Sequence, residues 1–109
     1  MAKQKNKTEE QYLGEIESSI VGLQYYEAEI KSGETVNLER EPENSHDRNA
    51  IRAENQDFDK VGHLPRKTVA WLAPLIDSGK IRVDGVVPKT EDHEIHHSCP
   101  LDLKIFLCK

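Results

Sequence analysis

Residues 35–54, TVNLEREPENSHDRNAIRAE, contain the two patterns that decide the fold. Val36 and Leu38 alternate with polar residues, which predicts a β-strand over residues 35–40. Residues 41–49 are rich in Pro, Asn, Ser and Asp, which predicts an ordered loop. A second short strand is expected over residues 50–54. The stretch therefore predicts two short strands joined by a polar loop.

The rest of the chain adds strands and one helix around this stretch. β-Branched and aromatic residues predict a strand over residues 16–26, with Gly22 marking a bulge or a close backbone approach. Pro65 is expected in the first turn of a helix that Pro74 kinks or shortens and Gly79 ends. Further strands are expected over residues 60–64, 81–87 and 101–107. These elements predict a mainly β fold with one or two short helices, in a small, partly open barrel of the OB-like or SH3-like kind.

The length of 109 residues is enough for one domain with a modest core. We expect a flexible polar tail over residues 1–14 and a single barrel domain over residues 15–109. The tail has no apolar stretch after its lysines, and no apolar run of the chain approaches about 18 residues, so we expect neither a secretory signal nor a membrane span. The two cysteines, Cys99 and Cys108, predict reduced thiols and a cytoplasmic protein. The chain is short for an enzyme with its own substrate pocket, and it has neither a glycine-rich phosphate loop nor a Rossmann fingerprint, so we expect no cofactor.

The charge of the chain is negative overall but unevenly distributed. Fifteen basic and twenty acidic residues give a net charge of −5, which argues against indiscriminate binding to polyanions. Residues 27–59 contain ten acidic and four basic residues, whereas residues 60–89 contain six basic and two acidic residues. A local basic face can bind phosphate on an acidic protein, but chance variation of a solvated surface explains the same pattern. Both interpretations stay open at this point.

Residues 93–97, HEIHH, match the zinc-protease motif HExxH, in which two histidines bind zinc and the glutamate is a general base. That motif requires a helix, and this stretch has no amphipathic stripe and is followed closely by Pro100. We therefore favour a solvated polar loop without metal. The weak alternative is a metal-dependent hydrolase, and its candidate ligands are His93, His96, His97 and Cys99.

Residues 44–49, NSHDRN, place two amides, an imidazole, a carboxylate and a guanidinium within six positions. Turn chemistry alone explains these residue types. Combined with residues 62–64 and the basic residues 66–67 at a helix N-terminus, they become a candidate ligand site, because helix N-termini attract phosphate. Tyr25 and Tyr26 are expected to point to opposite faces of their strand, one toward the core and one exposed for stacking on a base.

Four blocks of the sequence resemble the HIRAN domain family. They are V-G-L-x-Y-Y at residues 21–26, L-x-R-x-P-x-N-x-x-D-R-N-A-I at 38–51, V-G-H-L at 61–64 and D-G-V-V-P at 84–88. Four blocks in this order are much more specific than any one of them. The resemblance covers residues 18–108, and the chain is most similar to a stand-alone, bacterial-type HIRAN protein.

The resemblance implies a modified OB-like barrel that binds single-stranded DNA at a free 3′-hydroxyl end, without catalysis, in DNA repair or replication. It implies that Asp47 contacts the 3′-hydroxyl, that Tyr25 stacks on the terminal base and that Asn44 is a polar loop contact. His63 and Arg66 match residues on the phosphate side. The expected partners are DNA 3′ ends and a helicase or nuclease. The candidate nucleic-acid-binding residues are Tyr25, Tyr26, Asn44, His46, Asp47, Arg48, His63, Arg66 and Lys67.

Four positions depart from the pattern of the family's animal members. Gln24 stands in place of an arginine, and Pro65 in place of a lysine. His46 stands in place of a tyrosine, and Glu43 in place of an asparagine. These changes remove two cations and one large ring and add an anion, which predicts weaker DNA binding or a different ligand. The alternative function is a protein-interaction domain on a HIRAN barrel that has lost DNA binding.

Overall fold

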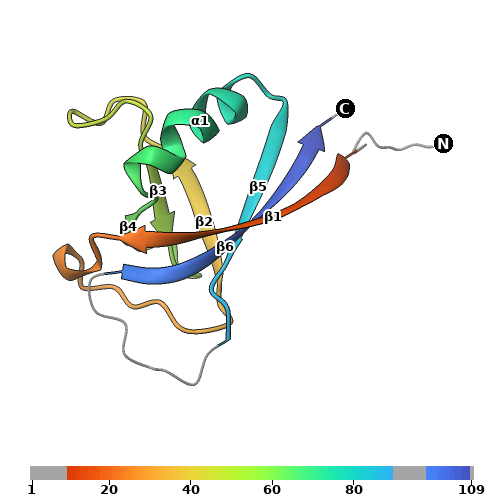
Figure 1. Cartoon of the computed structure of the whole chain (residues 1–109). Coiled ribbons are helices and arrows are strands. Elements are labelled where there is room, and N and C mark those ends of the chain that lie inside the picture. Colours follow the sequence, from red (N-terminus) through yellow and green to blue (C-terminus); the bar gives the residue numbers. More distant parts are fainter. Residues whose placement is uncertain (1–9, 90–97, 109) are drawn as a thin grey trace.

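The computed structural model describes residues 10–89 and 98–108. The strands of this part form a closed antiparallel barrel in the order β1-β4-β3-β2-β5-β6, with one α-helix beside it (Figure 1). The mainly β barrel predicted from the sequence is confirmed, although it is closed and not partly open. The elements are β1 (Glu10–Val21), η2 (Leu23–Tyr25), β2 (Thr35–Arg40), β3 (Ile51–Glu54), β4 (Lys60–His63), α1 (Arg66–Asp77), β5 (Ile81–Val86) and β6 (Ser98–Cys108).

The long strand β1 pairs with β6 from Glu10 opposite Cys108 to Val21 opposite Ser98. Residues 10–14, expected in the flexible tail, therefore belong to a strand. The reason is non-local, because β6 satisfies the backbone hydrogen bonds of a segment whose own side chains are mostly exposed. The predicted boundary at residue 14 lies inside β1, and residues 1–9 lie outside the described part.

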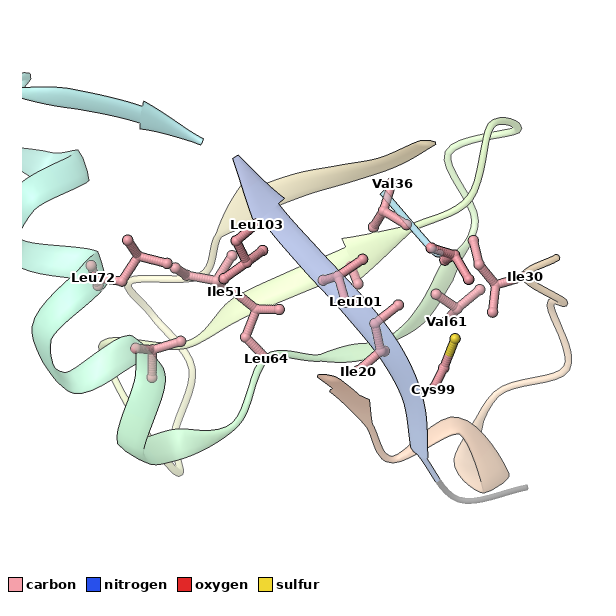
Figure 2. Close-up of a cluster of buried hydrophobic side chains, with 14 of the residues drawn as sticks. Ile20, Ile30, Val36, Ile51, Val61, Leu64, Leu72, Cys99, Leu101 and Leu103 are labelled. Atoms are coloured by element: carbon pink, nitrogen blue, oxygen red, sulfur yellow. The ribbon is translucent and has the colours of Figure 1, made fainter. Parts of the chain in front are cut away.

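The core fills the barrel and the space under α1. Figure 2 shows Ile20, Ile51, Leu101 and Leu103 pointing toward one another, with Leu72 entering from the helix. These five side chains are almost completely buried. Burial of each such side chain contributes roughly 1.5–3 kcal/mol before the entropy cost of ordering it. The core therefore fixes α1 against one end of the barrel.

The barrel closes where β4 meets the end of β1. The two strands pair at a single position, Val21 opposite His63. A Cβ atom on Gly62 would overlap the carbonyl oxygen of Val21, so the close approach of the two backbones requires glycine there. The closure places His63 beside the segment that follows β1.

The expected strand over residues 16–26 ends early, at Val21. Gly22 has a φ of 83°, a left-handed conformation that turns the chain from β1 into η2. The prediction that Tyr25 and Tyr26 alternate across a strand was therefore wrong. Tyr25 lies in η2 with 78% of its surface exposed, and Tyr26 follows η2 and is half-buried.

The helix α1 differs from expectation at its start and at Pro74. Pro65 is the residue before the first turn, with an extended backbone, so the helix begins at Arg66. Pro74 lies inside α1, which continues to Asp77 although proline lacks the N–H that would bond to the carbonyl of Ala70. Gly79, with a φ of 79°, follows the end of the helix as predicted. Among the described residues, no helix is both long and apolar enough to cross a membrane.

Candidate nucleic-acid interface

The loop between β2 and β3, residues 41–50, is folded by its own short polar side chains. The Asn44 Oδ1 atom accepts hydrogen bonds from the backbone N–H groups of His46 and Asp47, at 2.8 and 3.1 Å. The Asp47 Oδ1 atom accepts one from the N–H of Asn49 at 2.9 Å. Such contacts are the turn chemistry that the sequence predicted. They hold the loop in one conformation on the same side as η2, β4 and the first turn of α1 (Figure 1).

Arg40, the last residue of β2, connects this loop to α1 through hydrogen bonds. Its guanidinium donates two hydrogen bonds of 2.9 Å to the Asp77 carboxylate. It also donates to the carbonyl oxygens of Ala50 and Arg48, at 2.7 and 3.0 Å. The bond to Asp77 raises the pKa of Arg40, and the same contact lowers the pKa of Asp77. Arg40 is thus committed to structure and has little capacity left for a ligand.

Glu41 is the centre of a second network. Its Oε1 atom lies 2.8 Å from His63 Nε2 and accepts a hydrogen bond from Asn44 Nδ2 at 2.9 Å. Its Oε2 atom accepts a hydrogen bond from Lys60 Nζ at 2.8 Å. Burial by itself would raise the pKa of Glu41, but the bonds from Lys60, Asn44 and His63 outweigh burial and lower this pKa to about 2. The carboxylate is therefore charged at neutral pH and joins the loop to β4.

A pocket of about 250 Å³ lies between the loop, β4 and α1. One Asp47 oxygen, Oδ1, is held by the backbone, and the other, Oδ2, lies 3.7 Å from Arg66 Nε. That distance is an ion pair too long for a hydrogen bond, and Arg66 is 75% exposed, so Asp47 keeps the capacity to accept a hydrogen bond. The pocket is lined by Val21, Asn44, His46, Asp47, Ala50, His63, Leu64, Arg66 and Val69.

Neither tyrosine lines this pocket, but Tyr26 lies next to one of its residues, His63. The Tyr26 ring is 6.4 Å from the His63 ring, and Lys60 Nζ lies 5.4 Å from the Tyr26 centroid. Burial by itself would lower the pKa of Lys60, but Glu41 and Tyr26 raise it overall. Tyr25 has the exposed ring that stacking on a base requires.

Of the nine candidate residues, five line the one pocket: Asn44, His46, Asp47, His63 and Arg66. Arg48 and Lys67 are exposed and do not line it. The analysis of the sequence missed Arg40, Glu41 and Lys60. Glu41 is the first residue of the predicted loop and Arg40 precedes it, which could have brought both to attention. Their partners, Asp77 and Lys60, are distant in sequence, so only the fold shows the pairing.

The weak alternative of a metal site rested on the region of residues 93–99. His93, His96 and His97 lie outside the described residues. Cys99 is completely buried in the core, and burial raises the pKa of its thiol. Residues 10–89 and 98–108 contain no cluster of three or more His, Cys, Asp or Glu side chains suited to a metal ion.

The comparison with protein families gives one decisive match. The HIRAN domain matches residues 13–107, which is most of the chain. The chain belongs to the HIRAN domain family.

Similar proteins place HIRAN domains within larger chains. The helicase-like transcription factor (HLTF) of Mus musculus is 41% identical over 75 residues, which are 69% of this chain and 8% of that protein. A Fanconi-associated nuclease 1 homolog of Oryza sativa is 31% identical over 93 residues, which are 82% of this chain and 10% of that protein. This HIRAN chain thus spans about a tenth or less of the length of these relatives.

Solved structures of the human HLTF HIRAN domain have the same fold. A crystal structure superposes with a TM-score of 0.81 at 30% identity, covering 90% of this chain and 79% of that one. A solution structure of the HLTF HIRAN domain in its DNA-bound conformation gives a TM-score of 0.75 at 31% identity, with the same coverage of both chains.

Proposed function

We propose that this HIRAN domain binds single-stranded DNA at a free 3′-hydroxyl end and catalyses no reaction on it. The observation that carries the proposal is the Asp47 carboxylate, which lines a pocket with one oxygen held by the loop and the other able to accept a hydrogen bond. The existence of a DNA-bound conformation of the similar HLTF domain supports DNA as the ligand.

The chemistry of Asp47 fits an end that carries a hydroxyl group. A carboxylate accepts a hydrogen bond from a hydroxyl but repels a terminal phosphate. His63 and Arg66 line the same pocket and supply the groups that bind the phosphodiester of the strand. The exposed Tyr25 ring supplies stacking, which contributes roughly 1–3 kcal/mol per base without reading sequence.

The partner protein belongs to the same proposal. Relatives named as a helicase-like factor and a nuclease contain this domain as a small part. We propose that the chain acts with a helicase or nuclease in DNA repair or replication. A cytoplasmic location stays a prediction from the sequence.

The alternative is a protein-interaction domain, and the net charge of −5 favours it. Glu43, which is exposed in the loop, adds a negative charge close to the proposed DNA site. Salt dependence separates the two functions, because phosphate contacts make the affinity fall steeply with salt.

The test is fluorescence anisotropy with a labelled single strand of about ten nucleotides, bearing either a 3′-hydroxyl or a 3′-phosphate. The wild-type chain should bind the hydroxyl end more tightly, by roughly ten-fold, as expected for one charged hydrogen bond and one avoided repulsion. Asp47→Asn should abolish this preference. Its amide oxygen still accepts the bond from Asn49, so the loop keeps its fold.

The matched control is Asp57→Asn, which removes the same charge from an exposed residue in the turn between β3 and β4. This variant should keep the preference of the wild-type chain. An Asp47→Asn variant that still prefers the hydroxyl end would overturn the assignment of Asp47. Absence of binding to either strand at low salt would favour the protein-interaction alternative.

A further inference from the structure

A second hollow, of about 470 Å³, adjoins the pocket of Asp47. Asn44 lines both, so the two hollows meet at the loop. The second one contains three cations, Arg40, Arg52 and Lys60, and two carboxylates, Glu41 and Glu43. We name it the Arg52–Lys60 groove. Arg40 is bound to Asp77 and the Arg52 Nε atom faces Glu54, so Lys60 and the exposed end of Arg52 are the cations of this groove that can meet a ligand.

Arg52 has unused hydrogen-bonding capacity. Its Nε atom lies 2.7 Å from Glu54 Oε2, but this ion pair lacks hydrogen-bond geometry, and Nε is buried without a hydrogen-bond partner. The NH1 group lies 3.8 Å from Glu41 Oε2, which is also too long for a hydrogen bond. The side chain is 41% exposed. Arg52 therefore presents a guanidinium whose terminal donors can reach an anion from solvent.

Lys60 faces the same space from β4. Among the described residues its ammonium donates to Glu41, and it lies near the Tyr26 ring. An ammonium has three donors, so a second oxygen can bind beside Glu41 or in its place. Glu41 Oε2 thus lies between the two cations of the groove, where it partly neutralises both.

We propose that the Arg52–Lys60 groove is a second subsite. It binds phosphodiester groups that lie further from the 3′ end than the one held beside Asp47. Arg52 and Lys60 bind the phosphate, and Glu41 is the internal anion with which that phosphate competes. This inference rests on the proposed function, because the strand enters the groove only when its end lies at Asp47. The shared residue Asn44 gives the strand a continuous path from one hollow to the other.

The proposal predicts opposite effects for the two partners of one ion pair. Lys60→Gln removes a phosphate-binding cation and should weaken the binding of long strands. Glu41→Gln removes the competing anion and should strengthen it. A merely structural role for the pair predicts losses in both variants, since either one breaks the same contact. Arg52 is left unchanged, because its removal would leave the buried Glu54 carboxylate unpaired.

The experiment compares a dinucleotide with a hexanucleotide, both with a 3′-hydroxyl, by competition against a labelled strand. The affinity ratio of the two lengths isolates the groove, since both ligands use the pocket of Asp47. We expect Lys60→Gln to lower the ratio roughly five-fold, and to reduce the salt slope for the hexanucleotide by about 0.7. Glu41→Gln should raise the ratio. The matched control, Lys80→Gln, changes an exposed lysine just beyond the end of α1 and should leave the ratio unchanged.

Thermal unfolding of each variant checks that it is folded at the temperature of the binding assay. If Lys60→Gln and Lys80→Gln give the same ratio as the wild-type chain while Asp47 still discriminates the hydroxyl end, the groove is not a subsite and the proposed function stands. A lowered ratio in Glu41→Gln would also overturn the competition by Glu41. If the wild-type chain binds neither ligand, the proposed function and this inference both fail.

Discussion

The two ends of β3 use the same side-chain chemistry in opposite electrostatic surroundings. At one end, Asn44 Oδ1 accepts hydrogen bonds from the N–H groups of residues 46 and 47. At the other end, Asn55 Oδ1 accepts them from Asp57 and Asp59, at 2.9 and 3.0 Å. Each asparagine also donates one bond from Nδ2, to Glu41 or to the Glu29 carbonyl. The local turn chemistry therefore does not distinguish a binding loop from a structural turn.

Charge distinguishes the two ends. Around Asn44 two of the three carboxylates are paired with cations, Glu41 with Lys60 and Asp47 with Arg66, and the third, Glu43, lies among the cations of the Arg52–Lys60 groove. Around Asn55 lies a larger pocket of about 540 Å³ whose walls include four carboxylates and one lysine. That end repels a phosphate backbone despite its larger hollow. Charge pairing, and not pocket size or turn type, therefore distinguishes the proposed DNA site from the turn at the other end of β3. The carboxylates of the larger pocket belong to Glu29, Glu34, Asp57 and Asp59.

Replacing the two asparagines by alanine should separate stability from binding. Asn55 is only 7% exposed, and Asn55→Ala removes its hydrogen bonds with the N–H groups of Asp57 and Asp59 and with the Glu29 carbonyl, so the free energy of unfolding should fall by roughly 3 kcal/mol. Asn44 makes as many bonds but is more exposed, and Asn44→Ala should cost about half as much. Urea unfolding measures both.

The DNA affinity of the same variants should follow the reverse order. Asn44→Ala loosens the loop that carries Asp47 and should weaken binding, whereas Asn55→Ala should bind like the wild-type chain once it is folded. Equal losses of affinity would mean that the two ends are not functionally distinct.

Low pH should reduce the free energy of unfolding by protonating Glu41, which lies at the Asn44 end of β3. The folded-state pKa of Glu41 is about 2 against an ordinary value of 4.5. Because the folded value is the lower one, the charged carboxylate contributes its full stability above about pH 4.5, and this contribution is lost as the pH falls toward 2. After allowance for solvent screening it amounts to about 1–2 kcal/mol.

Urea unfolding at pH 7 and pH 3 tests this contribution. The Glu41→Gln variant should lose less stability between these pH values than the wild-type chain does, because it lacks the titrating group. Glu29→Gln, at the Asn55 end, is the matched control and should lose as much as the wild-type chain. Parallel losses in all three proteins would show that Glu41 does not carry the acid dependence.

Local patterns in the sequence were sufficient for much of the fold. The alternation at residues 35–40 and the turn residues of 41–49 predicted β2 and the loop, because both are decided by near neighbours. The start of β1 at Glu10 could not be predicted, since its order comes from pairing with β6, far away in the sequence. The end of β1 was missed because Gly22 adopts a left-handed backbone and turns the chain out of the strand.

In the candidate site, too, local features could be predicted from the sequence and contacts between distant residues could not. The expected grouping of the loop with His63 and Arg66 is present around the pocket. It could be predicted because the sequence motifs and the position of the helix N-terminus had singled out these residues. The Glu41 network was missed, since Glu41 is separated from Lys60 by 19 positions and from His63 by 22. Only the antiparallel course of β3 and β4 brings these side chains back to the loop. The roles assigned to the individual residues stay predictions.

The smallest effect should come from removing one negative charge at either end of β3. Glu43→Gln acts beside the Arg52–Lys60 groove and should raise DNA affinity roughly three-fold. Asp57→Asn acts beyond the opposite end of the four-residue strand β3, which spans about 10 Å. Since the Debye length is about 8 Å at 0.15 M salt, its effect should be less than about 1.5-fold there and should increase at low salt.

Anisotropy titrations of both variants at two salt concentrations decide between local and global electrostatics. Both substitutions change the net charge of the chain by the same amount, so a response to net charge alone predicts equal gains at every salt concentration. A gain in DNA affinity confined to Glu43→Gln at 0.15 M salt would show that the affinity depends on the charges of the loop between β2 and β3. In that case an overall negative chain can bind a polyanion. Salt screens the DNA from the acidic turn at the far end of β3, while the DNA contacts Lys60 and Arg66 directly at the Asn44 end.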